Sequence, residues 1–456
     1  MSNAPTAAKA EDGGGGGGEA DVLAGVPTEV LEAGLTDTCM HEVGHTLGLR
    51  HNFKGSTSLS LAEAQDPDVV AEKGLTSSVM DYLPLNLVSS KLRGDKKPLF
   101  FTPVIGEYDR WAIEYGYTKA EGEGLLRQHP DLAAVAAKAL PFSTDEDGPS
   151  SSGMDPTVST FDLGSEPLDF YEDKLDLVAE LRPSLLDRSV LLGAPFTDFQ
   201  QGETALLTQV LVAGLYAAKY VAGFETSKQR RVAEDTPAPL RAVSAERQRR
   251  ALALVVRVLS GDAPDGGADF LPAPAEVPEA VGRGGECTGM ERYCLAVTPY
   301  DLLSKVSLVR KRVLLNLVSL DRLKRLRIHR WADPEGLAGP ELFRELTTAI
   351  WGEGGFQGDR VKHWENWDIM LFWFDVLQAY AAAPATVGVP GDLTATAAGL
   401  VYALVEGGEG LPAGDEAQGL YRAAYRRMKE WESLGTAASG TAKMLLLLKG
   451  TGTPTT

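Results

Sequence analysis

Cysteine is scarce in this sequence. The chain of 456 residues holds three cysteines, Cys39, Cys287 and Cys294, too few for the disulfide framework that stabilises many small secreted domains. Two interpretations of Cys287 and Cys294 stay open, namely a disulfide that closes a small loop or two unpaired thiols. Cys39, which precedes a histidine-rich segment, is expected to be a small buried apolar residue.

Long apolar runs and export signals are also missing. No uninterrupted apolar window reaches about 18 residues, the length that predicts a membrane-spanning helix. The first 27 residues combine neither a basic n-region nor an apolar h-region, so they do not predict a signal peptide.

Positive charge is in deficit. The chain carries 44 Lys and Arg against 63 Asp and Glu, which gives a formal net charge of -19 and a pI near 4.9. Proteins that bind nucleic acid rely on clustered Lys and Arg to displace counterions from phosphates. We therefore expect no nucleic-acid partner.

Apolar residues three and four apart dominate the sequence, whereas alternating strand patterns are rare. The fold class is predicted to be mainly α, with helices at about 27–47, 168–192, 203–224, 245–259, 301–330, 359–383 and 416–434. Composition divides the chain into a flexible Gly-rich tail (1–25), a metal-binding subdomain (26–118), a helical region (119–260), a linker or long loop (261–298) and a helical C-terminal region (299–450).

Half of the six histidines fall within residues 41–51, which read HEVGHTLGLRH. His41 and His45 lie four apart, so on a helix both imidazoles project from one face and can share a metal ion. Gly48 allows the chain to leave the helix in a conformation that other residues avoid, and His51 can then turn back as a third ligand. Three ligands leave a fourth position open, as in catalytic zinc sites.

The residue types also predict the chemistry. Neutral imidazoles leave Zn²⁺ strongly Lewis acidic and lower the pKa of its bound water to about 7. Glu42, beside the first ligand, is the natural general base for hydrolysis. The competing interpretations are histidines buried in a helix core, and a structural zinc, which would normally have four protein ligands and would leave Glu42 without a task.

The elongated histidine motif resembles that of the metzincin zinc metalloproteases. In these proteins a methionine-containing turn, the Met-turn, lies beneath the metal, and SVMDY at 78–82 is similar to it. The resemblance implies that Met80 supports the site, together with Gly48. It also implies that Tyr82 is a candidate fifth ligand that stabilises the oxyanion. A tyrosine that merely packs at the surface is the alternative.

A more specific resemblance covers the chain from about residue 30 to near its end. It rests on four segments, 41–56, 78–82, 108–117 and 155–164, which are similar to bacterial proteins with an EcxA-type zinc-binding domain. Compared with that family, the chain is expected to lack the N-terminal half, because we find no candidate edge strand before residue 27 to bind a peptide by strand addition. The resemblance also implies a secreted or periplasmic location.

The sequence thus predicts a metzincin zinc-helix subdomain with a Met-turn, followed by a helical C-terminal region. The predicted function is a zinc-dependent metalloendopeptidase that acts on polypeptides, in which Glu42 activates a zinc-bound water. The alternative is a zinc-binding but catalytically incompetent fragment, or a helical interaction module.

Overall fold

The computed structural model describes residues 22–23, 26–93, 96–119, 130–138, 140–194, 197–228, 238–261, 301–412, 415 and 417–434. Cys287 and Cys294, most of the predicted Gly-rich tail and the predicted linker from residue 262 onward lie outside the described residues.

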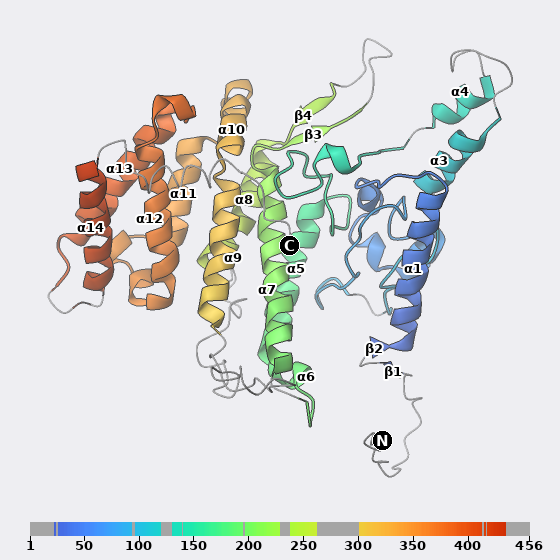
Figure 1. Ribbon diagram of the computed structural model, residues 1–456, viewed down its shortest axis with the longest axis horizontal. Coiled ribbons are helices and arrows are strands. Elements are labelled where there is room, and N and C mark those ends of the chain that lie inside the picture. Colours follow the sequence, from blue (N-terminus) through green and yellow to red (C-terminus); the bar gives the residue numbers. More distant parts are fainter. Residues whose placement is uncertain are drawn as a thin grey trace, which may run out of the picture.

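Helix α1 (Thr28–Thr46) carries the histidine motif and stands at one edge of the molecule (Figure 1). It begins directly after Pro27, whose fixed backbone geometry suits the start of a helix. Two short strands, β1 (Val22–Leu23) and β2 (Val26–Pro27), pair antiparallel just before it. The sequence did not predict these strands, because two residues are too few to give an alternating pattern.

The segment after α1 consists of loops and short helices. It contains the 3₁₀ turns η1 (Gly55–Ser58) and η2 (Glu63–Gln65) and helix α2 (Pro67–Lys73). Helix α3 (Glu107–Tyr117) and the short α4 (Pro130–Ala136) follow. Asp66 starts α2 by accepting a hydrogen bond from the backbone N–H of Asp68, and Pro67 occupies the first helical position.

The helical part of the chain matches the apolar periodicity, with breaks where local chemistry requires them. Pro183 separates α5 (Pro167–Leu181) from α6 (Leu185–Ser189). The segment 301–330, predicted as a single helix, forms two helices that are separated by residues 318–319. After α6, the helices and strands in chain order are α7 (Thr197–Ala217), β3 (Phe224–Thr226), β4 (Leu240–Ala242), α8 (Ala245–Ser260), α9 (Leu302–Leu317), α10 (Leu320–Ala332), α11 (Gly339–Trp351), α12 (Trp367–Ala381), α13 (Gly391–Gly408) and α14 (Ala417–Leu434).

Helix α7 runs through the middle of the molecule, and it packs on α5, α8 and α9 (Figure 1). One continuous apolar cluster extends from Leu61, near the histidine motif, to Met428 in α14. The prediction of a mainly α fold is confirmed. No helix of the described residues combines the length and apolar content needed to cross a membrane.

Candidate metal centre

The C-terminal end of α1 sets the direction of the chain after the helix. Gly48 has φ +85°, in the left-handed region that glycine adopts without strain. Its N–H donates to the carbonyl of His45 at 3.0 Å, and the N–H of Leu49 donates to the carbonyl of Gly44 at 3.1 Å. This pair of bonds is a Schellman ending, which reverses the chain and directs His51 back toward the helix.

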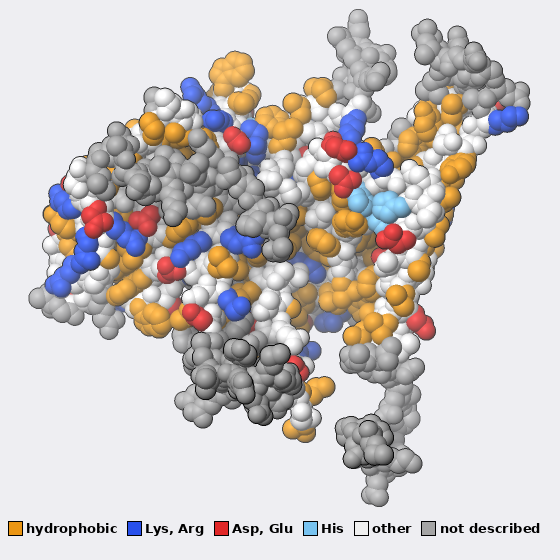
Figure 2. Space-filling model, viewed as in Figure 1, with side chains coloured by type: hydrophobic (Ala, Val, Ile, Leu, Met, Phe, Trp, Pro, Cys, Tyr) orange, Lys and Arg blue, Asp and Glu red, His pale blue; other side chains and the backbone are white. Residues whose placement is uncertain are grey.

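The reversal brings the three motif histidines together. His41, His45 and His51 each offer a ring nitrogen, and these nitrogens lie within 4.8 Å of one another. The ring centroids are 4.8 to 5.4 Å apart. Figure 2 shows the histidine side chains at the surface, with hydrophobic and acidic side chains around them.

Backbone carbonyls orient two of the rings. Nδ1 of His41 lies 2.7 Å from the carbonyl oxygen of Val79, and Nδ1 of His45 lies 3.1 Å from that of Leu49. A carbonyl oxygen only accepts, so each Nδ1 must be the donor and each Nε2 keeps its lone pair for a metal ion. Burial lowers the pKa of His41, and the neighbouring histidines add to this effect, which favours the neutral ring that binds metals.

The third ring supplies a direct test of whether a metal fits. Nε2 of His51 is buried and has no hydrogen-bond partner among the described residues. An unsatisfied buried nitrogen is costly, and a cation held by the three rings would satisfy it. The residues present therefore fit a metal ion with three imidazole ligands.

Two further side chains predicted for the site lie next to the histidines. Glu42 is exposed on α1. Its negative charge acts to raise the pKa of both His41 and Tyr82. The ring of Tyr82 lies 4.6 Å from that of His51 and 5.4 Å from that of His41. Burial, together with the charges of Asp145 and Glu42, raises the pKa of Tyr82, so its hydroxyl stays protonated near neutral pH.

Met80 lies directly beneath the helix. Its side chain is fully buried, and its carbonyl accepts a hydrogen bond of 3.1 Å from the N–H of Asn52. A Cβ atom added to Gly44 would come within 2.3 Å of the Met80 sulfur. Gly44 therefore lets the turn at 78–82 approach α1 closely, at the point where the helix carries its two histidines.

A buried carboxylate fixes that turn. Asp109 of α3 accepts hydrogen bonds from the hydroxyl of Ser78 at 2.6 Å, the N–H of Val79 at 2.8 Å and the N–H of Gly106 at 3.0 Å. Burial raises the pKa of Asp109 above its ordinary value, and these three donors offset only part of that rise. Val79 also orients His41, so α3 controls the position of one candidate ligand through the turn.

A second buried polar cluster lies on the other side of the turn. Ser56 donates from its N–H to Asp81 at 2.7 Å and from its hydroxyl to Asp162 at 3.1 Å. Burial raises the pKa of Asp162 to about 7, and burial with the charge of Asp162 raises that of Asp81 well above its ordinary value. Burial lowers the pKa of Lys219, which lies just after the end of α7, to about 7, and its side-chain nitrogen donates to the carbonyl of Val158 at 2.5 Å. These residues attach the site to the helical region.

Asp145 belongs to the site but was missed by the sequence analysis. Its carboxylate lies 2.9 Å from Nδ1 of His51, although the two residues are 94 positions apart. The hydrogen bond from His51 lowers the pKa of Asp145. A carboxylate that orients a metal-binding histidine is a common supporting interaction. The segment around Asp145 is rich in Ser, Asp and Gly, and nothing in its local pattern indicates this contact.

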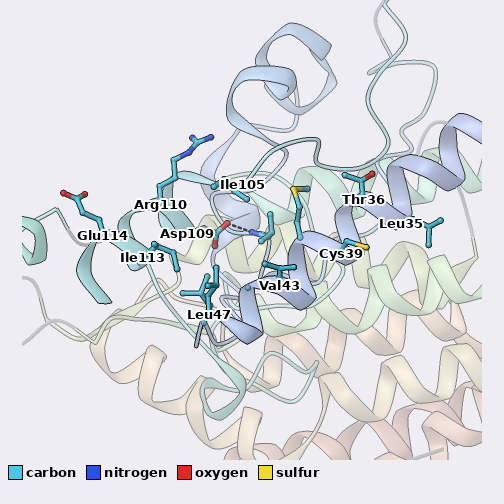
Figure 3. Close-up of a pocket in the computed structure, with 14 residues that line it drawn as sticks. Leu35, Thr36, Cys39, Val43, Leu47, Ile105, Asp109, Arg110, Ile113 and Glu114 are labelled. Atoms are coloured by element: carbon cyan, nitrogen blue, oxygen red, sulfur yellow. Dashed lines mark hydrogen bonds between the residues drawn. The ribbon is translucent and has the colours of Figure 1, made fainter. Parts of the chain in front are cut away.

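The face of α1 opposite the histidines is apolar and open. A groove of about 840 Å³ lies there between α1 and α3, with Leu35, Cys39 and Val43 on one wall and Ile113 on the other (Figure 3). Leu35 is 66% exposed and Val43 is 54% exposed. Cys39 is exposed as well, so the expectation that it is buried was wrong. Amphipathic spacing finds the apolar face of a helix but does not reveal whether anything covers it.

Comparison with known families gives a match that covers most of the chain. The model of a family described as Met-zincin matches residues 24–356. The match includes the histidine motif, the turn at 78–82 and Asp145. No curated protein and no solved structure matches the chain.

Replacing Gly44 tests the contact between α1 and the turn. We expect Gly44→Ala to destabilise the protein by about 1–3 kcal/mol, because the new methyl group must displace the buried Met80 sulfur. Chemical denaturation measures this change. Gly116→Ala on α3 is the control, since a Cβ there meets nothing within 4 Å and should leave stability equal or higher. Additive effects of Gly44→Ala and Met80→Ala in the double variant would contradict the proposed contact.

Removing the Asp145 carboxylate tests its role in orienting His51. We expect Asp145→Ala to weaken zinc binding by about 10–100-fold, because His51 loses the partner that holds its ring. Competition with a chromophoric chelator measures the affinity, and circular dichroism checks the fold. Glu146→Gln is the matched control. Glu146 lies in the same 3₁₀ turn as Asp145, and its carboxylate pairs with the exposed Arg50. Equal zinc affinity in the two variants would exclude this role.

Proposed function

The chain belongs to the Met-zincin family, and on that basis we propose that it is a zinc-dependent metalloendopeptidase. One observation carries the proposal. Three imidazoles converge on one point, and the one at His51 has a buried nitrogen without a partner. The finer assignment to the EcxA-type subfamily is also our proposal, and it is supported by the four sequence segments at 41–56, 78–82, 108–117 and 155–164.

His41, His45 and His51 would hold the zinc ion through their Nε2 atoms. Zinc in such a site supplies Lewis acidity, which polarises the peptide carbonyl and makes a nearby water more acidic. The side chains of the protein then provide the proton transfers and the alignment. The family description supports a polypeptide as the substrate.

Glu42 would act as general base and then as general acid. It takes one proton from the attacking water as the new C–O bond forms, and gives that proton to the nitrogen as the C–N bond breaks. The Glu42 side chain is exposed on α1, so it can contact both water and substrate. Glu42 directly follows the candidate ligand His41 in α1, which would bring its carboxylate close to the metal ion.

Tyr82 would serve the oxygen of the attacked carbonyl. Its raised pKa keeps the phenol protonated, so the hydroxyl can donate a hydrogen bond to the negative charge that develops there. When no substrate is bound, the same hydroxyl is a candidate fifth ligand. Both roles agree with the contacts of its ring with His41 and His51.

A zinc-binding protein without peptidase activity is the second candidate. In the part of the chain that the structure describes, the strands are two or three residues long. None of these is long enough to align an extended peptide by strand addition. If the protein binds zinc without peptidase activity, the helical region would serve as an interaction module.

Substitution of Glu42 separates the two candidates. We expect wild-type protein loaded with about one zinc per chain to cleave a fluorescence-quenched peptide library. Glu42→Gln should keep the zinc and lose activity by roughly 10²–10⁴-fold, because the proton transfers are lost. Elemental analysis gives the zinc content, and product analysis gives the rate.

The control is Glu32→Gln, which changes another exposed glutamate of α1 and should leave both readouts unchanged. A zinc-loaded wild type that cleaves no peptide would favour the inactive zinc-binding protein. Full activity in Glu42→Gln would exclude Glu42 as the base.

A further inference from the structure

Phe161 has an unusual backbone conformation beside the candidate metal centre. Its φ is +61°, in the left-handed region that bulky residues rarely adopt. Its side chain is nonetheless 51% exposed. A strained residue persists only where its surroundings hold it, and such residues cluster at functional sites. Because half of the Phe161 side chain is exposed, burial of its ring does not explain why the strained backbone conformation is kept.

Ala222 is the other non-glycine residue with positive φ among the described residues, and it makes a useful contrast. Ala222 is fully buried. Its N–H donates to Gln248 at 3.1 Å, and its carbonyl accepts from Arg325 at 3.1 Å. Packing and hydrogen bonds account for Ala222, whereas Phe161 directs a large apolar ring toward solvent.

The neighbours of Phe161 fix its position firmly. Its N–H donates to the carbonyl of Tyr82 at 2.8 Å. Thr160 shares a hydrogen bond of 2.7 Å with the hydroxyl of Tyr216 on α7. On the other side, Asp162 is fully buried and accepts the hydrogen bond from Ser56. The segment is therefore anchored on both sides, and only the ring of Phe161 is presented outward.

The ring of Phe161 continues an aromatic surface that starts at the histidines. Its centroid lies 6.5 Å from that of Tyr82, and the two planes differ by 19°. Tyr82 in turn lies 4.6 Å from His51. Apolar side chains adjoin the histidines on the exposed face of the molecule (Figure 2). Phe161 thus lies one side chain farther from the candidate metal ligands than Tyr82.

We propose that Phe161, with Tyr82, forms an apolar wall that selects peptide substrates with a large apolar side chain near the scissile bond. This inference rests on the proposed peptidase function. A carbonyl placed at the metal would leave the adjoining side chain of the peptide beside Tyr82 and Phe161. Burial of an apolar side chain against two aromatic rings favours leucine, isoleucine or phenylalanine over alanine or serine. Phe161 is then a specificity-determining residue.

The test measures peptide binding rather than cleavage. Zinc-loaded Glu42→Gln protein is immobilised and exposed to a capped hexapeptide library that is randomised at every position. The retained peptides should be enriched for large apolar residues at one position. For the selected peptide, replacing that residue by alanine should weaken binding by on the order of 10-fold.

Adding Phe161→Gly to this protein should abolish the preference, so that both peptides bind equally. The melting temperature should stay equal or rise, because glycine relieves the strained φ. Trp331→Ala removes an 87% exposed aromatic side chain from α10, and it should keep the preference.

The outcomes are distinguishable. A preference that survives Phe161→Gly overturns the inference and leaves the peptidase proposal intact. A clearly lower melting temperature in Phe161→Gly would assign the residue to packing, and this also overturns the inference. Retention of no peptide by the parent protein, when the zinc-loaded wild type cleaves the library, would overturn the inference alone. No cleavage by the wild type would overturn the proposed function, and the inference with it.

Discussion

The chain reversal at Gly48 is the constraint on which the rest of the site depends. Two histidines four apart on a helix can share a metal ion, but a third ligand requires the chain to turn back immediately. The φ of +85° at Gly48 and the two Schellman hydrogen bonds accomplish this turn. His51 then faces His41 and His45, and its ring is placed where Asp145 can orient it.

Buried polar groups transmit this geometry to the rest of the molecule. Asp109 holds the turn that lies beneath α1, and Asp81 and Asp162 connect the same turn to the segment that precedes α5. Lys219 links that segment to the end of α7. Isolated buried charges are costly, and clusters of hydrogen-bonded groups specify one arrangement. We therefore expect the metal centre and the adjacent helices to fold as one unit.

Local patterns predicted the parts of the site that lie close together in the sequence. Helical spacing and the properties of glycine were enough to predict the arrangement of His41, His45 and His51, and the pattern of a known family indicated Met80. Asp145 and Phe161 could not be predicted in this way, because each acquires its partner through a contact across about eighty residues or more. The burial of Cys39 was predicted wrongly, since spacing alone does not show what covers a helix.

We propose that three imidazoles hold a zinc ion at the end of α1. X-ray absorption at the zinc edge of the loaded protein tests this coordination, because it reports the type and distance of the ligands without relying on activity. We expect three imidazole nitrogens at about 2.0–2.1 Å and no sulfur. A sulfur ligand at about 2.3 Å, or a spectrum unchanged by His51→Ala, would contradict it.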